Sequence, residues 1–215
     1  MELPILTPVN RVAFIERYAR GKRVLHVGCA DMPFTQDRLE RGELLHPRLH
    51  VCARELAGVD LSDEGIAMLR AAGYDNLYVA DCEKPLSATT PGQYEVVVAG
   101  ETLEHVANAG DFLSSLRSVC QPNGRIVITT PNHASIKLAA RLFGRNEIVH
   151  PEHVAYYSVS TLSRLLSMVG LEPTDWRVYW AEKSPQSRVA NAALRRISRL
   201  QYFADGLCVA CRPAA

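Results

Sequence analysis

The chain has 215 residues, with 24 Lys and Arg against 23 Asp and Glu, and 47% of its residues are hydrophobic. The near-neutral balance argues against nucleic acid as a partner, because general nucleic-acid binders displace counterions with an excess of basic side chains. No run approaches the ~20 apolar residues of a membrane helix, and the first residues lack a secretory signal pattern. The six scattered cysteines indicate reduced thiols, so we expect a cytoplasmic protein with a single domain over residues 1–215.

Short apolar runs alternate with helical stretches along the first part of the chain. The predicted strands are 23–27, 57–61, 76–80, 94–99 and 125–129. The run Val96–Val98 is continuous in β-branched residues, which indicates a strand buried on both faces of a parallel sheet. Between the strands, Ser62 is placed to cap a helix. Residues 111–119 and a segment opened by Ser160 show the spacing of amphipathic helices.

The C-terminal third predicts strands over 171–182 and 206–211, joined by a helix over 188–200. Two late strands connected in this way suggest an antiparallel pair at one sheet edge. The predicted fold class is therefore α/β: a doubly wound, mostly parallel seven-stranded sheet with an antiparallel edge strand. Segments 133–160 and 184–204 would elaborate the substrate side or the sheet edge.

Acidic residues follow several predicted strands, at the sheet edge where open α/β sheets bind their ligands. Asp60 ends the second strand, where a carboxylate can accept hydrogen bonds from both hydroxyls of a ribose. The loop that begins at Gly28 lacks the G-x-G-x-x-G pattern, and Asp60 follows Gly28 by 32 residues rather than about 20. The sequence therefore disfavours a nicotinamide or flavin dinucleotide.

Five stretches in series resemble the class I S-adenosylmethionine-dependent methyltransferases, especially the branch acting on quinones, natural products and glycans. They are VLHVGCADM (24–32), GVDLS (58–62), VADCEKPL (79–86), YEVVVAGETLEHV (94–106) and QPNGRIVITTPN (121–132). HPEHVAYYSVSTLSRLL (150–166) also resembles the segment after the fifth strand in small-molecule members. The resemblance implies a Rossmann-like methyltransferase fold, an enzyme, and S-adenosyl-L-methionine as its cofactor.

The resemblance also implies which residues contact the cofactor, and they follow the first four strands: Gly28, Cys29, Asp60, Leu61, Asp81, Cys82, Glu101 and Thr102. Gly28 and Cys29 would line the methionine part of the cofactor through backbone atoms. Asp60 would bind the ribose hydroxyls and Leu61 would pack on the adenine. Asp81 would accept a hydrogen bond from the adenine amino group, whereas Glu101 and Thr102 would begin the loop between cofactor and substrate.

Three positions depart from the family pattern. His26 stands where the family usually has an acidic residue, and Ala30 and Met32 stand where it has glycines. Asp31 could supply the missing negative charge. Residues 55–104 hold ten acidic and two basic side chains, which suits a cationic cofactor, although acids at helix starts and turns account for most of them. These departures motivate a second hypothesis, a non-catalytic cofactor- or partner-binding protein that retains the fold.

Methyl transfer is a one-step displacement that needs alignment and, for some acceptors, a base, for which histidine is suited. The candidate catalytic residues are His105, after the fourth strand, and His150 and His153, in a segment expected to fold over the site. The alternative for His105 is a helix-start residue that packs on the loop. No metal is expected, because no set of histidines, cysteines or carboxylates stands at ligand spacing. Cys208 and Cys211 would point to opposite faces of a strand.

The sequence thus predicts an S-adenosylmethionine-dependent methyltransferase acting on a small molecule or glycan, with oxygen favoured over nitrogen as the acceptor atom. We expect a monomer or homodimer with no integral membrane segment. The basic segment 188–200 favours a solvated helix face over a patch for an anionic substrate or a membrane. The sequence does not identify the acceptor.

Overall fold

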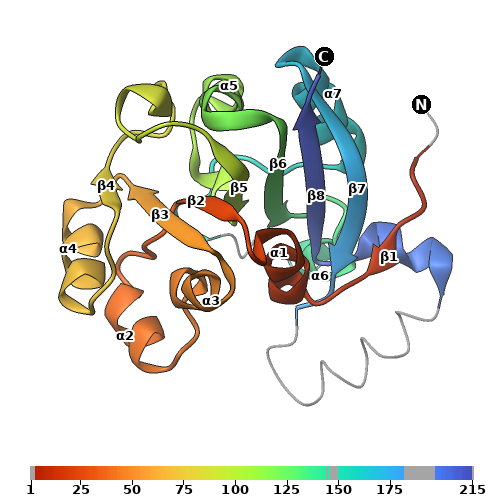
Figure 1. Ribbon diagram of the computed structural model, residues 1–215. Coiled ribbons are helices and arrows are strands. Elements are labelled where there is room, and N and C mark those ends of the chain that lie inside the picture. The colour runs from red at the N-terminus through yellow and green to blue at the C-terminus, as the bar shows by residue number, and fades with distance from the viewer. Residues whose placement is uncertain (1–2, 144, 146–149, 182–196, 215) are drawn as a thin grey trace.

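The computed structural model describes residues 3–143, 145, 150–181 and 197–214. Their strands form one sheet of eight strands in the order β1-β7-β8-β6-β5-β2-β3-β4 (Figure 1). The strands are β1 Thr7–Pro8, β2 Arg23–Val27, β3 Glu55–Asp60, β4 Leu77–Val79, β5 Tyr94–Gly100, β6 Cys120–Pro131, β7 Leu171–Tyr179 and β8 Gly206–Pro213. All five strands predicted in the first 130 residues are present.

The predicted fold class is confirmed. Strands β2 to β6 pair in parallel, and β8 is antiparallel to both β6 and β7. The two-residue strand β1 pairs in parallel with the outer side of β7 and adds an eighth strand to the seven expected. A strand of two residues leaves no apolar run in the sequence, so the sequence pattern does not reveal it.

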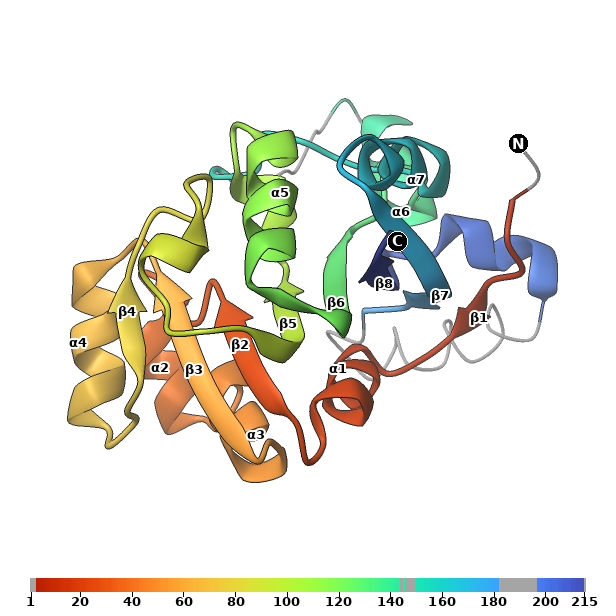
Figure 2. The ribbon, with the colours of Figure 1, turned by 45° about the horizontal axis from the view of Figure 1, so that its top comes forward.

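Helices cover both faces of the sheet (Figure 2). The α-helices are α1 Arg11–Ala19, α2 Thr35–Glu40, α3 Leu45–Cys52, α4 Asp63–Ala71, α5 Ala109–Val119, α6 Ile136–Phe143 and α7 Val159–Met168; the 3-10 helices are η1 Leu86–Ala88, η2 Leu103–His105 and η3 Ser198–Phe203. Buried side chains of α1 and α3 join the apolar core on one face, and those of α5 and α7 join the core on the other.

The alternation of side chains along β5 shows why its sequence is apolar without interruption. Val97 and Ala99 belong to the core beneath α5 and α7, whereas Val96 and Val98 belong to the core beneath α1 and α3. Because side chains alternate between the faces of a strand, a strand covered on both sides needs apolar residues at every position. The same alternation sends Cys208 and Cys211 of β8 into opposite cores, as predicted.

The start of α7 corrects one sequence prediction. The N-cap is Ser158, whose side chain accepts a hydrogen bond from the Thr161 backbone at 3.2 Å, and not Ser160, which is exposed within the first turn. The Thr161 hydroxyl in turn accepts from the Ser158 backbone, so the two residues form a capping box. The predicted cap at Ser62 is confirmed by its 3.0 Å bond from the Gly65 backbone.

Two further predictions concern the C-terminal third. The strand predicted over 171–182 ends earlier, at Tyr179. Most of the helix predicted over 188–200 lies outside the described residues. The structure describes the chain again from residue 197, and the 3-10 helix η3 begins at Ser198. Within the described residues, no helix combines the length and the apolar character needed to cross a membrane.

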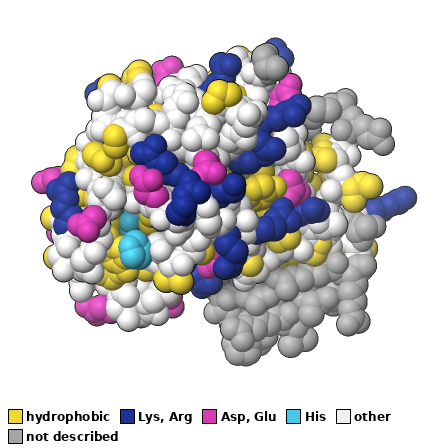
Figure 3. Space-filling model, in the orientation of Figure 1, with side chains coloured by type: hydrophobic (Ala, Val, Ile, Leu, Met, Phe, Trp, Pro, Cys, Tyr) yellow, Lys and Arg dark blue, Asp and Glu magenta, His cyan; other side chains and the backbone are white. Residues whose placement is uncertain are grey.

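Basic and acidic side chains are interspersed on the face shown in Figure 3. Ion pairs join Arg17 to Asp175 and join both Lys22 and Arg54 to Glu95. This face therefore carries mixed charge rather than a patch of one sign.

Candidate functional site

A pocket of about 1320 Å³ runs along the carboxyl ends of β2 to β6. Ligand pockets commonly measure 300–1,000 Å³, so this one can hold a cofactor together with an acceptor. Its walls include every residue predicted for the cofactor or for catalysis: Gly28, Cys29, Asp31, Asp60, Leu61, Asp81, Cys82, Glu101, Thr102, His105, His150 and His153. The fold thus brings together side chains that are spread over more than 120 positions of the sequence.

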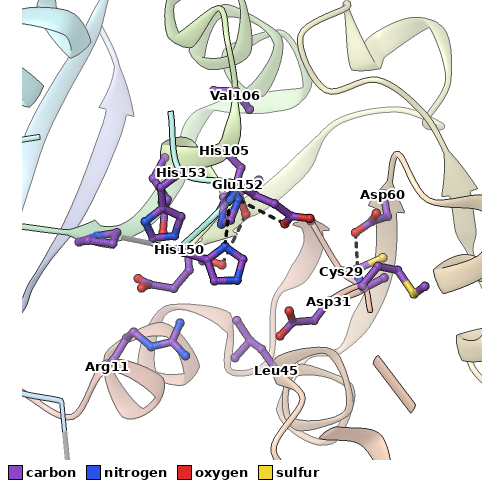
Figure 4. Close-up of a pocket in the computed structure, with 18 of the residues that line it drawn as sticks. Arg11, Cys29, Asp31, Leu45, Asp60, His105, Val106, His150, Glu152 and His153 are labelled. Atoms are coloured by element: carbon purple, nitrogen blue, oxygen red, sulfur yellow. Dashed lines mark hydrogen bonds and ion pairs between the residues drawn. The ribbon is translucent and has the colours of Figure 1, made fainter. Parts of the chain in front are cut away.

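Asp60 joins two loops of the pocket at the end of β3. Its Oδ2 accepts a hydrogen bond from the Ala30 backbone at 2.9 Å, and its Oδ1 accepts one from the Ser62 backbone at 3.0 Å (Figure 4). Burial raises the pKa of this carboxyl, and the backbone hydrogen bonds oppose that shift. Each carboxylate oxygen keeps a further lone pair, so the group can also accept from a ligand hydroxyl.

Gly28 lets the loop after β2 approach the loop after β5. Its φ of +72° lies in the left-handed region, and a Cβ there would lie 2.6 Å from Oγ1 of Thr102. That Thr102 hydroxyl donates to the backbone oxygen of Val27 at 3.3 Å. The loop is therefore closely packed without a side chain at position 28, which leaves its backbone accessible to a ligand.

The end of the pocket expected to hold adenine carries an exposed apolar side chain, Leu61, and an acidic one, Asp81. Leu61 is 70% exposed beside the pocket, whereas Leu44, another leucine of the pocket wall, is 4% exposed. Asp81 is held by the Glu83 backbone, which donates to it at 3.0 Å, and by Lys84. The Glu83 bond lowers the pKa of Asp81, which keeps that carboxyl ionised and able to accept a hydrogen bond.

The two pocket cysteines keep their thiols protonated, as expected for packing residues rather than reactive thiols. Burial raises the pKa of the Cys29 thiol far above its usual range and that of Cys82 to about 12. A thiol needs a lowered pKa to react as a thiolate. This agrees with the sequence interpretation of both residues as small side chains beside the cofactor.

His26, which departs from the family pattern, and Asp31, which was expected to compensate for it, both have partners within the protein. Asp31 forms an ion pair with Arg38, so the negative charge that it was expected to supply is balanced by a cation in the same pocket wall. His26 is buried and stacks on His46, with 3.3 Å between their Nδ1 atoms. Burial lowers the pKa of His26, so this position carries no charge at neutral pH.

Two acidic side chains of the pocket wall, Glu101 and Glu104, lie close together in the chain, and the sequence motifs single out only Glu101. Glu101 adopts a φ of +56°, and its Oε2 accepts a hydrogen bond from the Tyr179 hydroxyl at 2.8 Å. Glu104 is fully buried and accepts from Thr130 at 3.0 Å, and burial raises its pKa to about 8. Arg11 reaches the same pocket from α1 (Figure 4). Glu104 meets Thr130, and Arg11 comes near Glu104, only through the folding of distant segments, so no local motif signals Glu104 or Arg11.

Three histidines face one another at the end of the pocket away from Asp60 (Figure 4). His105 ends η2, and the ring centroid of His153 lies 4.7 Å from that of His105. His150 lies 5.7 Å from His105 and 5.1 Å from His153 by the same measure. Burial lowers the pKa of His105 and lowers that of His153 to about 4. His133 is exposed and is not among the residues that line the pocket.

The lining fits a cationic, adenosine-bearing cofactor. Acidic side chains outnumber basic ones in the pocket wall by nine to four. Oε1 of Glu101 is buried without a hydrogen-bond partner in the described part of the chain, and a ligand cation would satisfy it. The open backbone at Gly28 follows β2, and the Asp60 carboxylate and the exposed Leu61 stand at the end of the neighbouring strand β3, so the expected methionine, ribose and adenine contacts lie side by side.

Comparison with known families identifies the family of the domain. Residues 5–175 match the family model described as a methyltransferase domain, which is well over half of the chain. The chain therefore belongs to this family of methyltransferase domains, whose cofactor is S-adenosyl-L-methionine, and it has their Rossmann-like fold.

Individual relatives are more distant. The chain is 31% identical over 156 residues to a ubiquinone biosynthesis O-methyltransferase of Burkholderia lata, covering 70% of this chain and 60% of that protein. It is 25% identical over 167 residues to the enzyme of the same name from Bordetella pertussis, covering 73% of this chain and 65% of that protein. The match thus spans less than two thirds of these relatives. Magnesium protoporphyrin IX methyltransferase of Synechocystis PCC 6803, solved with bound SAH, shares the fold with a TM-score of 0.61 at 14% identity, over 95% of this chain and 80% of that one.

Proposed function

We propose that this chain is an S-adenosylmethionine-dependent methyltransferase that methylates an oxygen of a small molecule. The observation that carries the proposal is one pocket in which the predicted cofactor residues lie opposite three histidines. The curated relatives are named O-methyltransferases of ubiquinone biosynthesis, which supports a hydroxyl acceptor on a small molecule. A hydroxyl of a glycan is the other acceptor class that the sequence favours.

The bound cofactor supplies a methyl group on a sulfonium, which any aligned nucleophile can take. The protein's own contribution is to bind and align. Asp60 anchors one end of the pocket through a carboxylate already fixed by two backbone hydrogen bonds, so it loses little entropy on binding. The segment of His150 and His153 closes the opposite wall. The histidine nitrogens can accept the hydrogen bond of an acceptor hydroxyl and orient its oxygen.

The test measures cofactor binding and methyl transfer separately. S-adenosylmethionine labelled on its methyl group is offered with a panel of dihydroxybenzenes and hydroxylated glycans, and labelled product is counted. We expect transfer to at least one dihydroxybenzene. No binding of the cofactor at millimolar concentration would overturn the proposal. Binding without turnover on the whole panel would favour the non-catalytic alternative.

Substitution at Asp60 tests the ribose assignment. Asp60→Ala removes a charged acceptor, and a hydrogen bond of this kind contributes about 1.5–3 kcal/mol, so we expect the Kd for S-adenosylmethionine to rise by about 10- to 100-fold. Asp63→Ala is the matched control, because Asp63 is an exposed acid three residues away on α4. An equal Kd for both variants in isothermal titration would remove Asp60 from the cofactor site.

A further inference from the structure

Three imidazoles from two distant parts of the chain converge at the acceptor end of the pocket. His105 comes from η2, and His150 and His153 come from the segment that precedes α7 (Figure 4). Each offers one ring nitrogen, and the three nitrogens lie within 4.8 Å of one another. Three nitrogen donors that lie this close together are stronger evidence for a metal-binding site than a single histidine beside a pocket.

Backbone hydrogen bonds bring these two parts of the chain together. The Glu104 carbonyl accepts hydrogen bonds from the Val154 backbone at 2.9 Å and from the Ala155 backbone at 3.3 Å. These bonds hold the chain after His153 against the residue before His105. A turn closed by a 3.0 Å bond from the His153 backbone to the His150 carbonyl then brings the third ring back toward the other two.

Groups around the three rings are of the kind that orient metal-binding histidines. The Tyr156 hydroxyl lies 3.3 Å from Nδ1 of His153, and Oε2 of Glu152 lies 3.8 Å from Nδ1 of His105. A hydroxyl or carboxylate at the outer nitrogen fixes the ring and raises its basicity as a ligand. Glu152 also places a negative charge beside three otherwise neutral ligands.

We propose that His105, His150 and His153 together bind one divalent first-row transition ion of the Zn²⁺ type. Imidazole nitrogen suits such ions, whereas Mg²⁺ and Ca²⁺ prefer oxygen ligands. Tetrahedral coordination at about 2.0–2.1 Å would place the nitrogens about 3.4 Å apart, so the rings would close by roughly 1.4 Å at most. His150 is exposed, and rotation about its side-chain bonds can make that adjustment with loss of the long, 3.4 Å hydrogen bond that its Nδ1 accepts from the Glu152 backbone.

Three protein ligands leave the fourth position of a tetrahedral ion open, as in catalytic rather than structural zinc sites. Here that position faces the pocket, since all three histidines line it. The role of the ion rests on the function proposed above. An acceptor hydroxyl bound to the ion would have a lowered pKa and lose its proton to water, while the electron pair stays on the oxygen. That oxygen would form a bond to the methyl carbon as the methyl–sulfur bond breaks, and the sulfur would keep the electron pair and leave as S-adenosylhomocysteine.

Cobalt titration tests the site without any measurement of activity. The full chain is treated with a chelator, freed of it, and titrated with Co²⁺ while its visible absorption is recorded. We expect one Co²⁺ per chain with the intense absorption of tetrahedral coordination, abolished by one equivalent of Zn²⁺. A wild-type spectrum that stays that of the aqueous ion would overturn the proposal.

Variants then assign the ligands. His150→Ala is the first choice because His150 is exposed, and His153→Ala is the second; each should weaken binding at least about 100-fold. Tyr156→Phe should weaken it by about 10- to 100-fold, as loss of an orienting partner does. His133→Ala is the matched control, since His133 is exposed and outside the cluster, and it should bind as the wild type does. Equal loss in the control, or none in the His150 and His153 variants, would contradict the assignment.

The same samples separate this proposal from the proposed function. Calorimetry with S-adenosylmethionine reads the cofactor end of the pocket, and the cobalt spectrum reads the histidine end. Cofactor binding with no cobalt site would overturn the metal proposal and leave the methyltransferase proposal standing. A cobalt site without cofactor binding would overturn the methyltransferase proposal and leave the metal proposal standing.

Discussion

At Gly28 the backbone conformation and one neighbouring side chain both restrict the residue type. A left-handed φ of +72° is costly for any residue with a Cβ, and Thr102 occupies the space that the Cβ would need. Thr102 itself is fixed by its bond to the Val27 carbonyl, so it cannot move aside without losing a partner. One glycine and one threonine thus set how closely two pocket loops pack.

We therefore expect Gly28→Ala to destabilise the protein by about 3 kcal/mol, from backbone strain of about 1–2 kcal/mol and overpacking of similar size. Gly73→Ala is the control, because Gly73 has a φ of +90° but no heavy atom within 4 Å of the place a Cβ would occupy, so it should cost strain alone. In a Thr102→Ala background, the cost of Gly28→Ala should fall to that of Gly73→Ala. Urea unfolding measures all four variants, and equal costs at positions 28 and 73 in the wild type would refute the packing argument.

At the scale of elements, α7 connects the histidine-bearing segment to the core. Leu162 and Leu166 are buried against the core that α5 shares, while the chain before Ser158 carries the pocket residues His150 and His153. The capping box at Ser158 fixes where the helix begins. It therefore also fixes how many residues remain to span the pocket wall.

We expect Ser158→Ala to cost about 1 kcal/mol of stability, because the first turn of α7 loses an acceptor for its backbone N–H groups. In a domain of this size that loss lowers Tm by about 2–4 °C. Ser160→Ala should change stability by less than about 0.5 kcal/mol, because Ser160 is exposed and makes no capping bond. Calorimetric melting of the two variants decides between them, and a larger effect at Ser160 would restore the cap predicted from the sequence.

At the scale of the whole molecule, the pocket touches the ends of five neighbouring strands and the helices α1, α2, α3 and α6. A ligand that binds there contacts only the folded chain, since unfolding separates these strand ends. Binding energy at the pocket therefore adds to the stability of the entire sheet.

S-adenosylhomocysteine at 100 times its Kd should stabilise the folded state by about 2.7 kcal/mol. That corresponds to a rise in Tm of roughly 5–10 °C for a domain of this size. At the same ligand concentration the stabilisation in Asp60→Ala should fall to about 0.4–1.4 kcal/mol, a Tm rise of roughly 1–6 °C, and it should persist in full in Asp63→Ala. Differential scanning calorimetry measures it, and an unchanged Tm in the wild type would argue against a cofactor site in this pocket.

Much of the fold was predictable because its signals are local. Val96–Val98 identified a doubly covered strand, and Ser62 identified a helix start, from residues that lie next to one another in the chain. The error at α7 is equally local: Ser158 and Ser160 both precede an apolar periodic run, and only the backbone geometry distinguishes a cap from a first-turn residue. Strand ends shifted by a few residues for the same reason.

The candidate site was predictable only in part. Asp60 and Asp81 were identifiable because they follow strands at the edge where ligands bind. The sequence assigned His105, His150 and His153 to the same site, but it did not reveal that the three rings converge on one another. His105 and His150 lie 45 positions apart, and their encounter depends on hydrogen bonds to the Glu104 carbonyl. Ligand spacing along the chain is a useful guide only when the ligands share one element.

The position of β8 in the sheet determines when β6 and β7 can be joined during synthesis. β8 lies between β6 and β7, and β1 is attached only to β7 within the sheet. During synthesis β7 emerges before β8, so it has no sheet neighbour besides β1 until residues 206–213 leave the ribosome. Throughout that interval a nascent chain would carry two unpaired edges, one on β6 and one on β7. Such edges attract other chains, so the time between residues 179 and 213 is the period in which slow translation would most increase aggregation.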